Sequence, residues 1–78
     1  MELLASGVNA RALARAIDGS ELVLWDEERD LVYAWNGSLT VNVYGLDGVT
    51  VDMWMVEEPV PSVSAMRQQI RDRIVAGL

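Results

Sequence analysis

Residues 21–56 read ELVLWDEERDLVYAWNGSLTVNVYGLDGVTVDMWMV, and this stretch decides the fold. Apolar, β-branched and aromatic residues fill it, and three short polar or glycine-containing segments divide it into four runs, as in successive β-strands. Asn36-Gly37 is its strongest turn signal, because both residues tolerate the positive φ of a two-residue hairpin turn. We therefore predict an antiparallel meander of four strands.

The Asn36-Gly37 turn also predicts which residues share a face of the sheet. It pairs Trp35 with Ser38, and side chains alternate between the two faces along each strand. One face is then apolar and faces the core, with Val32, Ala34, Leu39, Val41 and Val43. The other is a mixed aromatic and polar face, with Leu31, Tyr33, Trp35, Ser38, Thr40, Asn42 and Tyr44.

The next turn, at residues 45–48, allows two registers of opposite parity. A tight turn would place Asp52 and Trp54 on the core face. A longer turn, in which Gly48 forms a left-handed bulge, places Val51, Met53 and Met55 there and leaves Asp52 outside the core. We predict the second register, because it keeps a carboxylate out of the apolar face.

The first run, residues 21–26, is expected to be an edge strand whose register is open. A four-residue loop after it would send Val23 and Trp25 to the core, and a five-residue loop would send Leu22 and Leu24. The apolar pattern alone fits both.

Two helices flank the meander. The first begins near residue 9, ends at Asp18-Gly19, and carries apolar residues at helical spacing: Ala10, Leu13, Ala14 and Ile17. The second follows the linker prolines, starts at Ser62 or Ser64, and covers the core face with Val63, Met66, Ile70 and Ile74. The side of the sheet that the first helix covers is open. Residues 1–78 are thus predicted to form one α+β domain, a two-layer sandwich of order α-β-β-β-β-α.

The composition excludes several classes of function. The chain has no cysteine and no histidine, so it lacks thiolate chemistry, disulfides, and the commonest general base and metal ligand. No two carboxylates are placed across a recognisable cleft, and we expect no enzyme activity, cofactor or metal. The acidic start, Met1-Glu2, is unlike a signal peptide, and no apolar run could span a membrane, so we expect a cytoplasmic protein.

Four aromatic residues form the candidate interface: Tyr33, Trp35, Tyr44 and Trp54. The predicted register places them on the face away from the second helix, where they could bind a protein, join copies of the chain, stack nucleic-acid bases, or be covered by the first helix. The net charge of −6 opposes nucleic-acid binding.

Carboxylates at two turns form a candidate acidic patch: Asp26, Glu27, Glu28, Asp30 and Asp47. A meander places both turns at the same end, where the patch could contact a basic protein or a divalent cation. Charged hairpin tips are also ordinary solvated surface, and the spacing matches no calcium-binding loop.

The segments WDEERDLVYAWNG, LTVNVYGLDGVTVDMW and SVSAMRQQIRDRI resemble small uncharacterised accessory proteins of bacteriophages of high-GC bacteria, in which arginine replaces lysine. This resemblance implies a non-virion protein that binds a host protein in the host cytoplasm, and it assigns no functional residue. The element order is also similar to that of double-stranded RNA-binding domains, but the basic helix start of those domains is missing.

The leading hypothesis is a small acidic protein-protein interaction module, an inhibitor or modulator of a host protein, that associates through its aromatic face or an edge strand. The alternative is a homo-oligomeric structural subunit, most simply a homodimer, with no catalytic role. A nucleic-acid binder that uses the aromatic sheet face comes third.

Overall fold

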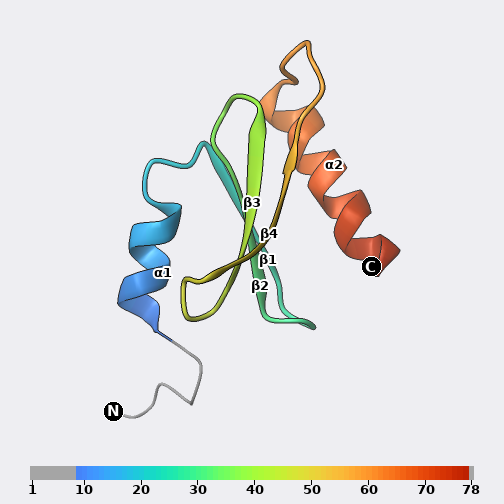
Figure 1. Cartoon of the computed structure of the whole chain (residues 1–78). Coiled ribbons are helices and arrows are strands. Elements are labelled where there is room, and N and C mark those ends of the chain that lie inside the picture. The colour runs from blue at the N-terminus through green and yellow to red at the C-terminus, as the bar shows by residue number, and fades with distance from the viewer. Residues whose placement is uncertain (1–8, 78) are drawn as a thin grey trace.

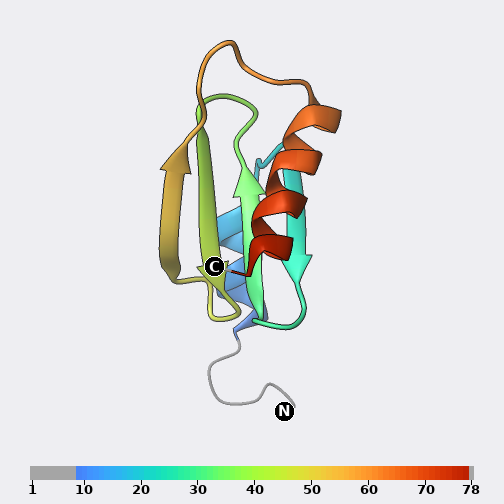
Figure 2. The same cartoon turned by 90° about the vertical axis from the view of Figure 1, so that its right-hand side faces the viewer.

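The computed structural model describes residues 9–77 of the chain. Its elements are α1 (Ala10–Ile17), β1 (Leu22–Asp26), β2 (Leu31–Trp35), β3 (Thr40–Gly45), β4 (Thr50–Met55) and α2 (Val63–Ala76). The strands form one antiparallel sheet in the order β1-β2-β3-β4, so the predicted α+β meander is confirmed. Helix α2 packs on one side of the sheet, and α1 lies on the other (Figures 1 and 2).

Both helices begin at a polar side chain that accepts a hydrogen bond from the first turn. Asn9 Oδ1 accepts from the Ala12 amide at 3.0 Å, and Ser62 Oγ accepts from the Ala65 amide at 3.2 Å. Ser62 is therefore the cap of α2, the first of the two predicted starts. Within residues 9–77, neither helix has the length and hydropathy needed to cross a membrane.

The hairpin between β2 and β3 differs from the prediction. Trp35 pairs with Val41 and not with Ser38, because the chain forms a longer loop around the side chain of Asn36. Asn36 Oδ1 accepts hydrogen bonds from the amides of Ser38 (2.8 Å) and Thr40 (3.3 Å). The register moves by three positions, which is an odd number, so the faces of β2 are reversed relative to β3. The predicted register was wrong.

The turn between β3 and β4 forms as predicted. The Gly48 amide donates to the Gly45 carbonyl at 3.0 Å, and Gly48 is left-handed with φ of 82°. Helix α1 meets this turn, since the Asn9 amide donates to the Leu46 carbonyl at 2.9 Å. The turn therefore ties the first helix to the sheet.

A bulge at the start of β4 then overturns the predicted faces of that strand. Val43 pairs with Asp52 and not with Val51, although the preceding pair follows the predicted register. Trp54 consequently lies on the side of α2, and Met53 lies on the opposite side. An extra residue in one strand shifts every later side chain by one position, which is why a single bulge has this effect.

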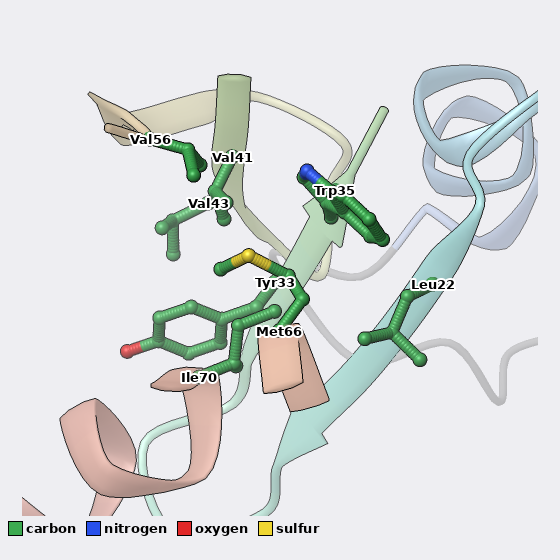
Figure 3. Close-up of a cluster of buried hydrophobic side chains, with 8 residues drawn as sticks. All are labelled: Leu22, Tyr33, Trp35, Val41, Val43, Val56, Met66 and Ile70. Atoms are coloured by element: carbon green, nitrogen blue, oxygen red, sulfur yellow. The ribbon is translucent and has the colours of Figure 1, made fainter. Parts of the chain in front are cut away.

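The main core lies between the sheet and α2, and aromatic residues of β2 fill its centre (Figure 3). The prediction was correct for Val41 and Val43 of β3 and for Met66 and Ile70 of α2, but Val63 is exposed. The faces predicted for β2 and β4 were wrong. Large aromatic rings bury more apolar area under the helix than valine and alanine would, and Val32 and Ala34 are buried on the opposite side of the sheet. The core residues are Leu22, Tyr33, Trp35, Val41, Val43, Val56, Met66 and Ile70.

Strand β1 joins β2 through the four-residue loop, one of the two predicted alternatives. Asp26 pairs with Leu31, and Trp25 pairs with Val32. Because the main core lies on the other face of β2 from the one predicted, Leu22 is buried beside Trp35, while Trp25 remains 57% exposed.

Candidate functional site

The four predicted interface aromatics do not form one exposed surface. Trp35 is only 2% exposed, and its Nε1 donates a hydrogen bond to the Ser38 carbonyl at 3.0 Å. Tyr33 is also buried in the core, whereas Tyr44 is half-buried on the other side of the sheet. The prediction that the aromatic residues face away from α2 is therefore correct for Tyr44 and wrong for the other three, because the register of both hairpins differs from the one assumed.

Trp54 is half-buried at the boundary between β4 and α2. Its ring meets Tyr33 edge-on with centroids 6.1 Å apart, and the guanidinium of Arg73 lies over it at 3.8 Å. Burial raises the pKa of the Tyr33 hydroxyl, so the phenol stays neutral at physiological pH. Beside this group lies a pocket of about 340 Å³, lined by Leu31, Tyr33, Val43, Val51, Asp52, Trp54 and Arg73.

Asp26 does not belong to an exposed acidic patch, which corrects the prediction. It is 3% exposed, and its Oδ2 accepts a hydrogen bond from Arg29 at 2.8 Å. Its Oδ1 accepts from the Glu28 amide at 3.1 Å. Hydrogen bonding to the Arg29 side chain lowers the pKa of the Asp26 carboxyl. Arg29 also donates to the Ile74 carbonyl at 3.3 Å, so this ion pair connects the β1-β2 turn to the end of α2.

The other members of the predicted acidic patch remain at the surface or shape their own turn. Glu27, Glu28 and Asp30 are exposed. Asp47 is half-buried, and its Oδ1 accepts from the Val49 amide at 3.0 Å. In the part of the chain that the structure describes, no three carboxylates come close enough together to hold a metal ion. The turns lie at the same end of the sheet, as predicted (Figure 1).

The sheet exposes apolar side chains along its β4 edge. Strand β4 is the last in the sheet order and lies at the side away from α2, as the amber strand of Figure 2. Val51, Met53 and Met55 are 57%, 47% and 59% exposed, and within β4 only Trp54 is partly covered. We call the outer side of Thr50–Met55 the open edge.

Backbone groups of the open edge point away from the sheet. The Val56 amide donates to the Leu39 carbonyl at 2.7 Å, so amides at alternate positions face β3 and those of Met53 and Met55 face outward. The Met53 amide donates a hydrogen bond to the carboxylate of the adjacent Asp52 at 2.8 Å. Within residues 9–77 no other strand pairs with this side of β4.

The open edge lacks most of the features that keep edge strands apart. The chain has no lysine, β4 contains no proline, and Asp52 is its only charged residue. The other edge strand, β1, has one face packed against α2, and on its other face Val23 and Trp25 are 41% and 57% exposed. An apolar edge that carries a single charge and has no neighbouring strand is a site for pairing with another strand.

Comparisons of this protein with protein-family models, with curated proteins and with solved structures find no match in any of the three. The candidate site therefore stands on the described residues alone. Sequence reasoning placed Val51, Met53 and Met55 in the core and so missed the open edge. The sequence did contain a signal for the open edge. The last strand of the predicted meander carries a single charge and has no lysine or proline.

Proposed function

We propose that this protein is a small acidic protein-protein interaction module that binds its partner through the open edge. The observation that carries the proposal is the exposure of Val51, Met53 and Met55 on an edge strand with backbone amides that point away from β3. Burying apolar side chains against a partner is favourable, and the outward-facing amides and carbonyls of the open edge can form hydrogen bonds to an added strand.

The role that we propose is that of a phage-type inhibitor or modulator of a host protein, acting in the host cytoplasm. The resemblance to phage accessory proteins supports this role. Strand addition needs only one free edge, which the open edge supplies.

A homo-oligomeric subunit is the second candidate, because a sheet edge is also complementary to the same edge of another copy. Binding of nucleic acid through the aromatic sheet face has less support. Tyr33 and Trp35 are buried in the core and are not available to stack on bases.

The test compares wild-type protein with Met53→Pro in light scattering and in capture from a lysate of a high-GC bacterium. Proline removes an outward-facing amide whose hydrogen bond goes to the Asp52 side chain, so no hydrogen bond to β3 is lost. We expect wild-type protein to capture a partner and Met53→Pro to lose it, with little change in melting temperature. Arg67→Gln, on the exposed face of α2, is the control and should bind normally. A wild-type monomer that captures nothing, or an unchanged Met53→Pro, would refute the proposal.

A further inference from the structure

We infer that the open edge takes an extended segment of another protein in which apolar residues alternate with arginine or lysine. The inference rests on the proposed function and specifies the chemistry of its partner. Three features carry it: the different character of the two faces of β4, the carboxylates along and beyond this strand, and the repulsion that a second copy would meet.

The two faces of β4 are complementary to different side chains of an added strand. Met53 and Met55 lie on the side of α1, and both are exposed thioethers that pack well against apolar side chains. Asp52 lies on the side of α2 and is exposed. Since side chains of an extended segment alternate between faces, the segment that matches both is apolar at every second position and basic between them.

Negative charge is concentrated around this strand. Residues 47–58 contain Asp47, Asp52, Glu57 and Glu58 and no arginine. Arg73 reaches the strand from α2, where it stacks on Trp54, and it can offset only one of these charges. Cations of an added strand would therefore meet Asp52 within β4 and the other three carboxylates beyond its two ends, which favours a basic partner.

A second copy of the chain would meet repulsion at the same edge. Two edges related by a two-fold axis pair antiparallel, so the start of one strand lies beside the end of the other. If the two-fold axis passes through residue 55, Asp52 of one copy lies opposite Glu58 of the other. If it passes through residue 54 or 53, Asp52 lies one position from Glu57, or Asp47 lies one position from Glu58. Symmetry repeats each such contact, and like charges across strands are destabilising.

The probe is a short fluorescent peptide in which valine and arginine alternate, titrated with the whole protein at physiological ionic strength. We expect saturable binding. The same peptide with glutamate in place of arginine should bind at least about tenfold more weakly, because its charge repels the edge. A valine-arginine peptide that is N-methylated at alternate residues keeps its charge but cannot pair with the edge, and it should also bind at least about tenfold more weakly.

Protein variants with equal changes in charge locate the binding site. Glu57→Gln with Glu58→Gln removes two charges at the end of β4, and Glu27→Gln with Glu28→Gln removes two at the β1-β2 turn. We expect the first pair to weaken peptide binding about threefold or more, since exposed ion pairs contribute modestly. The second pair should have little effect. Neither pair alters a buried side chain, so both variants should fold.

The inference would be overturned if the N-methylated peptide bound as tightly as the unmethylated one, or if the two double variants weakened binding equally. Either result would mean that the peptide is held by nonspecific charge attraction. No binding of the valine-arginine peptide would overturn it as well. If Met53→Pro nevertheless abolishes capture of a lysate protein, the proposed function survives and only the basic partner is wrong. If light scattering shows a dimer that Met53→Pro dissociates, the occupant is a second copy.

Discussion

The guanidinium of Arg73 lies 3.8 Å from the centre of the Trp54 ring, and that ring meets Tyr33 edge-on. Helix α2 packs against β1 at the far side of the sheet and reaches β4 through this contact. The stack thus connects the core to the strand that carries the open edge. A partner that pairs with β4 would bind beside this stack.

Arg73→Gln should lower the free energy of unfolding by about 0.5–1 kcal/mol, the usual contribution of a partly exposed cation-π pair. Arg67→Gln on the same helix is the control and should change stability less. Because Arg73 also lies in the last turn of α2, a double-mutant cycle with Trp54→Leu separates the ring contact from its effect on the helix end. Urea denaturation measures both, and a coupling energy of zero would contradict the prediction.

The Asp26-Arg29 ion pair makes stability depend on pH in the acid range. Hydrogen bonding to Arg29 lowers the pKa of Asp26 in the folded protein below the ordinary value of 3.8. The pair therefore stabilises fully above that ordinary value, and this contribution is lost as pH falls through the folded pKa. In Asp26→Asn this part of the acid dependence should be missing. Denaturation of both proteins across this range tests it, with Glu27→Gln as the exposed control.

The elements and their order could be predicted from the sequence because local signals specify them. Asn9 and Ser62 cap the helices as their positions indicate, and Gly48 forms the predicted left-handed turn. The faces of the sheet could not be predicted, because a shift of the strand register by an odd number of residues reverses which side chains share a face. The Asn36 side chain lengthens one loop by bonding two amides, and the bulge at Val51 adds one residue to β4.

The candidate site was missed for the same physical reason. With the assumed registers, Met53 and Met55 faced the core and Trp35 faced outward, which is the reverse of the structure. Asp26 was assigned to the surface because a hairpin tip usually is solvated. Its burial depends on Arg29, which also bonds the distant Ile74 carbonyl, a contact that no local pattern in the sequence indicates.

The three tryptophans should differ sharply in their contribution to stability. Trp35→Ala removes a buried ring and leaves a cavity, so we expect a loss of about 3–5 kcal/mol. Trp25→Ala removes a ring that is 57% exposed and should cost about 1 kcal/mol or less. Urea denaturation followed by far-UV circular dichroism measures both. Similar losses for the two variants would contradict the face assignment described above.

Gly48→Ala should destabilise the protein for two reasons, the left-handed backbone and the close approach of α1. A second glycine, Gly19, shares only the first of them. Gly48 is left-handed with φ of 82°, and a Cβ there would lie 2.7 Å from the backbone carbonyl carbon of Ala12 in α1. Gly19 has nearly the same φ of 81° and open space around it. Gly19→Ala should therefore cost only the about 1–2 kcal/mol of a left-handed alanine, and Gly48→Ala roughly 1–3 kcal/mol more. Equal losses in thermal denaturation would mean that α1 does not pack against this turn.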